Sequence, residues 1–230
     1  MQITFDIYND RKKEIEFYLS VIKQIDLDAT AISTNDNAML LRIMKSNLIL
    51  MLYNITEACI SNGLREIFEQ LSNDKLHYSQ IIVELQHIWT NYEIKKIYGP
   101  ASPLKSYQNK ATELIETVLN QSSIKFEFTK QLVNMDGNLD SKKIQEICNT
   151  YKIRHKARST PTLEKIKNGR NSLAHGSDSF SQYSQSLSVA DLEKYKNDVL
   201  MFLQKILEGM KNYYDNKSYS DNNTVTTAAT

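Results

Sequence analysis

The sequence predicts an all-α protein built as an up-and-down helical bundle. Six Gly and three Pro in 230 residues are too few for the many tight turns of a β-sandwich or β-barrel. Apolar residues recur every three or four positions along most of the chain, which is the period of an amphipathic helix. The composition, with 41% hydrophobic and 24% charged residues, is that of a globular protein large enough to bury a core.

Seven segments show the helical period. The first helix is expected over residues 10–26, and a long second helix over residues 37–71, where Gly63 is a candidate interruption. A third helix is expected over residues 74–97, and Gly99 and Pro100 end it. A shorter helix follows at about residues 107–120.

Capping residues mark the last three helices. Asp140 is the expected N-cap of the first of them. The second begins at Thr160-Pro161, since Pro is favoured at the first helical position, and it ends at Gly176. The third opens with the capping-box pattern Ser188-Val189-Ala190-Asp191 and keeps its apolar spacing as far as Tyr213.

No linker is long enough to divide the chain. We therefore expect one domain over residues 1–216, with an irregular insertion near residues 99–138. Residues 217–230 are expected to form a disordered tail, because a segment rich in Asn, Thr, Ser and Ala has nothing to bury.

The sequence predicts neither secretion nor membrane insertion. The N-terminus lacks the basic and apolar regions of a signal peptide, and the longest apolar run, near residues 48–52, is far shorter than the roughly 18 residues of a membrane span. Two lone cysteines, Cys59 and Cys148, offer neither a disulfide framework nor metal-ligand spacing. A reducing, cytoplasmic location is expected.

Several catalytic classes lack their sequence signatures. The four histidines form no HExxH or HxxxH pair, and no carboxylate cluster has EF-hand spacing. The chain also has no G-x-S-x-G elbow, Walker loop or Rossmann fingerprint. We therefore expect no metal and no cofactor.

One stretch, Gly169-Arg170-Asn171-Ser172-Leu173-Ala174-His175-Gly176, combines a permanent cation with a titratable imidazole near a helix end. Five residues turn a helix by about 500°, so Arg170 and His175 point about 140° apart with a rise of about 7.5 Å between them. For both to meet one substrate, the helix has to end at His175, or a second copy has to face it across a two-fold axis. Asn171 is placed to bind a phosphate or to orient the imidazole.

These residue types suit metal-independent cleavage of RNA. A histidine can take a proton from the ribose 2′-OH, and an arginine can hold the phosphate and stabilise the charge that develops on its oxygens. Attack by the 2′-oxygen leaves a 2′,3′-cyclic phosphate and a 5′-OH, and DNA has no 2′-OH to attack. The alternative is structural: Arg170 and His175 both suit a helix C-terminus, where cations interact favourably with the helix dipole.

The wider context of this stretch resembles the HEPN superfamily, and more narrowly the MAE-type HEPN-like nucleases of prokaryotes. The specific part is TLEKIKNGRNSLAHG at residues 162–176, followed by Ser-Phe-Ser at 179–181 and SVADL at 188–192. Softer matches are RKKE at 11–14, LMLYNITE at 50–57 and GNLD at 137–140, so the resemblance covers most of residues 8–219.

The resemblance implies a helical bundle that forms a homodimer, in which two R-x4-H motifs make one composite RNase site without a metal. It also implies a role in toxin–antitoxin or phage-defence modules. By the motif match, Arg170 and His175 are catalytic and Asn171 supports them. Glu57 is a weaker candidate, as an acidic helix residue facing the site; the alternative is a surface or capping partner.

Two details qualify the resemblance. HEPN toxins with a nucleotidyltransferase antitoxin usually carry a tyrosine two residues after the histidine, and Ser177 occupies that position here. Another antitoxin or a defence-system partner is therefore expected. Gly169 disfavours the helix by about 1 kcal/mol relative to Ala. Close approach of a second chain or of substrate would explain it, and simple tolerance is the alternative.

A basic segment adjoins the motif. Residues 141–170 contain nine basic and two acidic side chains, a net charge of +7, whereas the whole chain carries only +1. We expect RNA contacts from this segment, with Tyr151 and His155 as candidate stacking partners for bases. A solvated surface is the alternative. The expected RNA-binding side chains are Arg154, Lys156, Arg158, Lys165 and Lys167.

Three functional hypotheses follow. The first is a cytoplasmic, homodimeric, metal-independent endoribonuclease that acts as a toxin or defence effector. The second is a non-catalytic HEPN module that binds RNA or protein. In the third, the apolar faces of the long helices serve mainly an assembly with an unrelated partner protein.

Overall fold

The computed structural model describes residues 1–29, 35–99, 103–126, 129, 133, 135 and 137–221. Within these residues there is no β-strand, only two isolated bridges, so the prediction of an all-α fold is confirmed. The helices are α1 (Gln2–Ala29), α2 (Asn35–Asn73), α3 (Val83–Lys95), α4 (Leu104–Leu119), α5 (Ser141–Thr150), α6 (Pro161–His175), α7 (Phe180–Tyr183) and α8 (Val189–Asp215).

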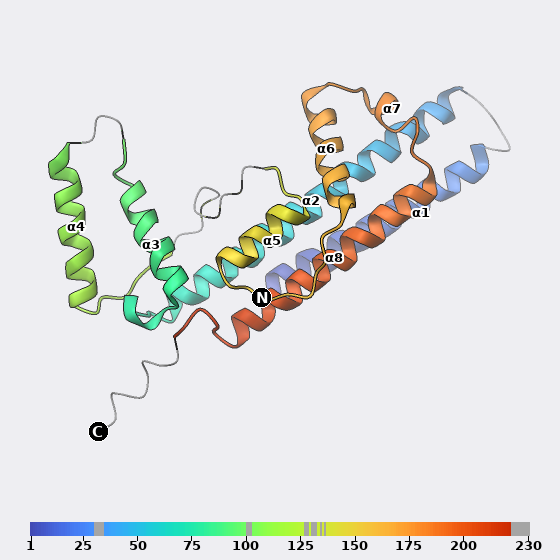
Figure 1. The fold of residues 1–230 in the computed structure, drawn as a ribbon. Helices are drawn as coiled ribbons and strands as arrows, with labels where there is room; N and C mark the ends of the chain where they lie inside the picture. The colour runs from blue at the N-terminus through green and yellow to red at the C-terminus, as the bar shows by residue number, and fades with distance from the viewer. Residues whose placement is uncertain are drawn as a thin grey trace.

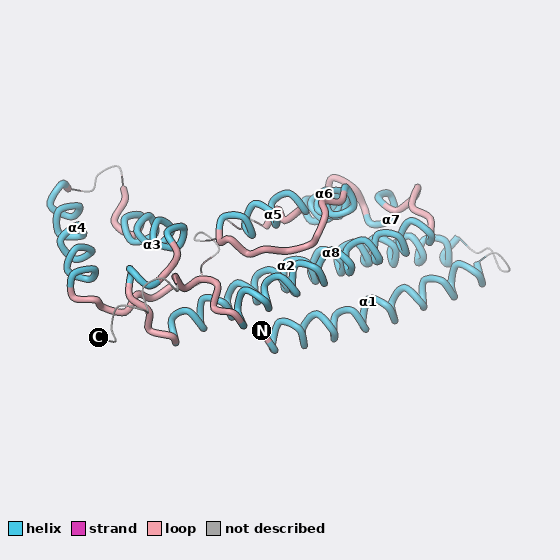
Figure 2. Tube along the Cα trace, turned by 60° about the horizontal axis from the view of Figure 1, so that its bottom comes forward, coloured by secondary structure: helices cyan, strands magenta, loops and turns pink. Residues whose placement is uncertain are grey.

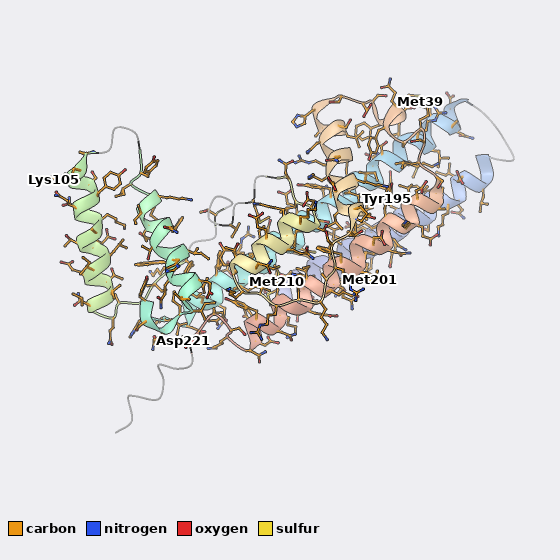
Figure 3. All side chains as sticks on the ribbon, in the orientation of Figure 1. Met39, Lys105, Tyr195, Met201, Met210 and Asp221 are labelled. Carbon is orange, nitrogen blue, oxygen red and sulfur yellow. The ribbon has the colours of Figure 1, made fainter. Side chains whose placement is uncertain are left out.

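Three long helices form the body of the bundle. Helices α1, α2 and α8 run side by side, and α5, α6 and α7 lie over one side of them (Figures 1 and 2). Helices α3 and α4 form a hairpin that projects from one end of the bundle, with Lys105 at its outer edge (Figures 1 and 3). Helix α2 contacts α1, α6, α7 and α8 and is therefore the central element.

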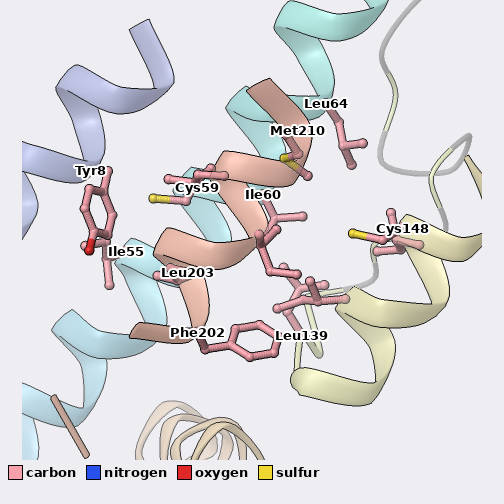
Figure 4. Packing of buried hydrophobic residues seen from close by; sticks show 14 of the residues in the cluster. Tyr8, Ile55, Cys59, Ile60, Leu64, Leu139, Cys148, Phe202, Leu203 and Met210 are labelled. Carbon is pink, nitrogen blue, oxygen red and sulfur yellow. The ribbon is translucent and has the colours of Figure 1, made fainter. Parts of the chain in front are cut away.

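The core forms around α2 because its apolar residues face several neighbours. Leu48, Ile55 and Ile60 are fully buried on this helix, and Figure 4 shows α2 residues packed between α1, α5 and α8. Gly63 does not interrupt α2. A Cβ atom at Gly63 would lie 2.6 Å from Sδ of Met210, so the missing side chain lets α8 approach closely.

The apolar character of α2 extends further than the short run near residues 48–52 suggests. Between Asp36 and Asn73 the helix is long and apolar enough to cross a membrane, judged by length and composition alone. In the bundle, α2 packs against four other helices. Its composition is therefore accounted for by a central position in the core.

The predicted caps of the last helices are confirmed. Asp140 Oδ1 accepts a hydrogen bond of 2.9 Å from the Lys143 amide at the start of α5. Thr160 caps α6, where Pro161 is the first residue, and Gly176 ends it with φ of 72°. Ser188 caps α8 through a bond of 3.1 Å from the Asp191 amide. Each cap joins residues at most three apart, so local sequence determines it.

The predicted third helix, over residues 74–97, begins too early. Helix α3 starts at Val83, and the residues before it bond to distant parts of the chain instead. The Leu76 carbonyl accepts from the Ile124 amide at 2.9 Å, and the Ile82 amide donates to the Tyr219 carbonyl at 3.0 Å. These long-range backbone bonds replace the α-helix that the apolar spacing indicates, and only a single 3-10 turn, Tyr78–Gln80, forms between them.

The tail prediction is wrong for residues 217–221. Tyr219 is fully buried, and its ring lies 5.8 Å from that of Tyr213. Its hydroxyl donates to Asp74 at 2.7 Å, and Lys217 forms an ion pair with the same carboxylate at 2.8 Å. The segment therefore closes the end of the bundle, while residues 222–230 lie outside the described part of the chain.

We expect Tyr219→Ala to lower the free energy of unfolding by about 3–5 kcal/mol, because it leaves a cavity and removes a hydrogen bond to Asp74. Urea denaturation followed by circular dichroism measures this change. The matched control is Tyr98→Ala, since Tyr98 is 74% exposed and its removal should change stability by less than about 0.5 kcal/mol. Equal stability of the two variants would contradict the proposed closure.

Candidate active site

Helix α6 carries the R-x4-H motif and ends where the motif ends. Its last helical residue is His175, and the Gly176 amide donates back to the Ser172 carbonyl. The Ser177 amide donates to the same carbonyl at 3.0 Å, so two backbone bonds close the helix. The chain turns away directly after His175, which leaves the imidazole at the helix terminus.

Arg170 lies over an aromatic ring of the central helix. Its Cζ is 4.9 Å from the centroid of the Tyr53 ring, and Nη1 donates to Asn171 Oδ1 at 2.9 Å. A cation over an aromatic face is attracted by the negative electrostatic potential there. The half-buried guanidinium is therefore held in one orientation by its neighbours.

Tyr53 joins three parts of the site. Its ring is buried, its hydroxyl donates to the Gly137 carbonyl, and the Leu139 amide lies 3.4 Å from the hydroxyl oxygen. The residues before α5 are thereby held against α2, close to Arg170. Sequence reasoning did not identify Tyr53 as a site residue, although it lies in the 50–57 stretch of the family resemblance.

Asn171 supports the arginine and not the imidazole. Its Oδ1 accepts from Arg170, and its Nδ2 donates to Asn138 Oδ1 at 2.9 Å. Both polar atoms of the carboxamide are therefore occupied. In a single chain, Asn171 therefore links Arg170 on α6 to Asn138 in the segment before α5.

The His175 side chain is exposed and makes no hydrogen bond or ion pair to the residues described. One turn earlier, Ser172 donates to Asp178 beyond the helix end, which ties the following loop to α6. The imidazole is therefore accessible at the surface while the loop around it is anchored.

Glu57 lies on α2 one turn after Tyr53 and is half-buried. Within the described part of the chain, the side-chain hydrogen bond of Arg170 goes to Asn171 and not to Glu57. Glu57 therefore lies on the same face of α2 as Tyr53, whose ring supports Arg170.

The five candidate RNA-binding side chains divide into two groups. Lys167 forms an ion pair of 2.6 Å with Asp140, and Lys165 lies 5.9 Å from the Tyr195 ring centroid on α8 (Figure 3). Lys165 is nevertheless exposed, and so are the three side chains on the segment that joins α5 to α6: Arg154, Lys156 and Arg158.

The pair between Lys167 and Asp140 is part of the fold. Burial alone would raise the pKa of Asp140, but hydrogen bonds from Lys167 and the Lys143 amide outweigh it and hold that pKa below its usual value. The carboxylate thus caps α5 and binds α6 at the same time. Lys167 is less available for phosphate than its sequence position suggests.

Two further predictions concern aromatic and sulfur side chains. Tyr151 is buried, with its ring 5.4 Å from that of Phe68, so the prediction that it stacks on bases is wrong. The thiols of Cys59 and Cys148 are buried, and burial raises the pKa of each to about 12. Neither cysteine is a thiolate nucleophile at neutral pH.

The reason for Gly169 is intramolecular. A Cβ atom there would lie 2.0 Å from Oη of Tyr183 and 3.1 Å from Cγ2 of Ile49. The Tyr183 ring of α7 thus packs on Gly169, and Ile49 of α2 approaches the same position. The sequence had suggested close approach of a second chain or of substrate as one explanation of this glycine. The packing within the chain makes that explanation unnecessary.

The geometry defines a class of protein: an all-α bundle that presents an R-x4-H motif at the C-terminal end of a short helix packed on a central helix. A family model described as MAE_28990-like HEPN matches residues 4–219. The chain belongs to this HEPN family. Neither the curated proteins nor the solved structures contain a match.

We expect Gly169→Ala to lower the free energy of unfolding by about 1–3 kcal/mol, because the new methyl group collides with the Tyr183 ring. In a Tyr183→Ala background the same substitution should cost less, because only the 3.1 Å approach to Ile49 remains and the higher helix propensity of alanine opposes that cost. A double-mutant cycle by urea denaturation measures the coupling. A stabilising effect of Gly169→Ala in the otherwise unchanged protein would contradict the packing.

Proposed function

We propose that this HEPN protein is a metal-independent endoribonuclease, with Arg170 and His175 as its catalytic residues. The observation that carries the proposal is the difference between the surroundings of the two side chains. Arg170 is held by Tyr53 and Asn171, whereas His175 is exposed at the end of α6. A fixed cation suits the binding of a phosphate, and an accessible imidazole suits proton transfer.

The reaction follows from the two groups. His175 takes the proton from a ribose 2′-OH, and the 2′-oxygen attacks the neighbouring phosphorus. Arg170 donates to the non-bridging oxygens, where negative charge increases. The bond from phosphorus to the 5′-oxygen breaks, that oxygen takes up a proton, and the products are a 2′,3′-cyclic phosphate and a 5′-OH.

A homodimer would complete the site. Side chains five residues apart on one helix point about 140° apart, so Arg170 and His175 of one α6 face different directions. A two-fold axis beside α6 would bring His175 of one copy toward Arg170 of the other. Asn171 would act as a positioning residue for the arginine, and Glu57, one turn after Tyr53 on α2, would be a weaker contributor.

The biological role proposed is that of a cytoplasmic toxin or phage-defence effector, with an antitoxin or a defence-system protein as partner. Ser177 at the position where related toxins carry a tyrosine favours a partner that does not modify that residue. The neighbouring genes would test this role directly, since they would encode the inhibitor or the rest of the defence system.

The first test is cleavage of single-stranded RNA by the purified protein in EDTA. We expect Arg170→Ala and His175→Ala each to reduce the rate by at least about a hundredfold, and the wild-type rate to be unaffected by chelation. The products should carry a 2′,3′-cyclic phosphate, and a DNA strand of the same sequence should stay intact.

The matched controls are His87→Ala on α3 and Arg42→Ala on α2, since both side chains are exposed outside the motif. Their rates should equal that of wild type. Full activity of His175→Ala, or loss of wild-type activity in EDTA, would refute the mechanism. RNA binding without cleavage by the wild-type protein would instead favour the non-catalytic module.

The second test asks whether one site uses residues of both copies. Arg170→Ala and His175→Ala chains, each inactive alone, are co-expressed with different tags and the mixed dimer is purified. Each mixed dimer would contain one intact Arg–His pair if the pair forms between copies, so its activity should be about half that of wild type. An inactive mixed dimer would show that each site takes both residues from one chain.

A further inference from the structure

A cavity of about 1330 Å³ lies between the end of α5, the segment after it and the C-terminal part of α8. It is separate from the R-x4-H motif, since no residue of α6 lines it. Its wall is rich in groups that form hydrogen bonds, including Glu84, Asn149, Lys152, Arg154, Asn212 and Asn216.

Gly209 allows this cavity to form where it does. A Cβ atom at Gly209 would lie 2.5 Å from the Arg154 carbonyl oxygen and 2.8 Å from Cβ of His155. The segment after α5 thus lies directly against α8. This contact places Arg154 and His155 beside Asn212 and Tyr213, which follow Gly209 by one turn of α8.

Two buried polar atoms in the wall have no hydrogen-bond partner. Among the residues described, Nδ1 of His155 and Oη of Tyr213 are the buried side-chain atoms in this state, and both residues line the cavity. Tyr213 is only 3% exposed. Buried polar groups are usually satisfied, so two orphans at one cavity indicate a ligand that supplies the missing bonds.

The protonation states of His155 and Tyr213 define which hydrogen-bond donors and acceptors the ligand must carry. Burial lowers the pKa of His155 and outweighs a hydrogen bond with the Ala157 backbone, which acts in the opposite direction; the imidazole is therefore neutral at pH 7, and Nδ1 is its unpartnered nitrogen. Burial raises the pKa of Tyr213, so its hydroxyl remains a donor. Together with the carboxamides of Asn149 and Asn212, the wall matches a ligand edge that carries both donors and acceptors.

The charge at the cavity is positive. Lys152 is paired with Glu84 at 3.2 Å, whereas Arg154 is exposed and forms no ion pair with the described residues. Because Lys152 is paired and Arg154 is not, Arg154 is the cation available to a phosphate group. The chain turns between α5 and this arginine at Lys152, whose φ is 58°, a conformation that favours glycine.

We propose that this cavity binds one unpaired nucleotide of the RNA substrate, as a recognition subsite separate from the cleavage residues. The base edge would bond to His155, Tyr213 and the carboxamides, as in recognition of single-stranded RNA, and the phosphate would bond to Arg154. The inference rests on the proposed function only in taking RNA as the ligand.

The chain between the two sites supports a continuous path for a strand. Six residues before α6 and nine residues of α6 separate Arg154 from Arg170, so their Cα atoms are at most about 40 Å apart. Lys156 and Arg158 are exposed between them and can contact phosphates along the way. An oligonucleotide of ordinary length reaches both sites.

The decisive variant is Tyr213→Phe, because it removes only the unpartnered hydroxyl and keeps the ring. Affinity for a fluorescein-labelled single-stranded RNA 20-mer is measured by anisotropy in a His175→Ala background, which prevents cleavage. We expect the Kd to rise about three- to tenfold, while the Tm stays the same or rises because an orphan polar group is lost. Tyr98→Phe, at an exposed position, is the matched control and should leave the Kd unchanged.

Unchanged RNA affinity of Tyr213→Phe would overturn the proposal. A second arm titrates the four nucleoside 5′-monophosphates in the absence of RNA. Binding of a free mononucleotide as tightly as the 20-mer would assign the cavity to a free nucleotide and would also overturn the RNA subsite. Weaker binding than the 20-mer, with the same loss in Tyr213→Phe, would support it.

The experiment distinguishes this inference from the proposed function. If wild type does not cleave RNA and Tyr213→Phe still weakens RNA binding, the cavity is supported as an RNA-binding subsite and the cleavage mechanism is refuted. If wild type cleaves RNA and Tyr213→Phe binds RNA as tightly as wild type does, the cleavage mechanism is supported and the RNA-binding role of the cavity is refuted.

Discussion

The close contact between α6 and α2 determines the candidate site. Gly169 brings α6 near enough to α2 for Tyr183 to pack over the glycine against Ile49, and one residue later Arg170 lies over the Tyr53 ring. Because Tyr53 is buried in the central helix, its position is fixed by the core. The guanidinium therefore takes its orientation from the packing of the whole bundle rather than from its own helix.

Local features of the site could be predicted from the sequence, and long-range ones could not. Thr160, Pro161 and Gly176 set the ends of α6 through bonds to residues within the same helix, so the position of His175 at a helix terminus was predictable. The ring of Tyr53 beneath Arg170 joins residues more than a hundred positions apart, and no spacing rule identifies such a pair. For the same reason the buried Tyr219 and the absence of an α-helix in the described residues just before α3 differ from the sequence predictions.

Folding also determines which charged side chains remain available to a partner. The basic segment 141–170 carries a net charge of +7, but several of its lysines serve structural ion pairs with carboxylates elsewhere in the chain. Lys152 pairs with Glu84, and Lys167 with Asp140. Exposed cations remain on α5, on α6 and on the segment that joins them: Lys142, Arg154, Lys156, Arg158 and Lys165. These side chains provide the charge available to a partner.

The two motif residues differ in how much freedom the fold leaves them. Arg170 is bonded to Asn171 and rests on Tyr53, so turning it toward its own His175 would break both contacts. His175 has no such contacts, but it lies on a different side of α6 about 7.5 Å along the axis. Moving the imidazole of the same chain to the guanidinium would require unwinding the end of α6, which Gly176 and Ser177 hold closed. In the proposed homodimer, the imidazole of a second copy would instead approach the guanidinium from outside the chain, with the contacts of Arg170 to Tyr53 and Asn171 intact.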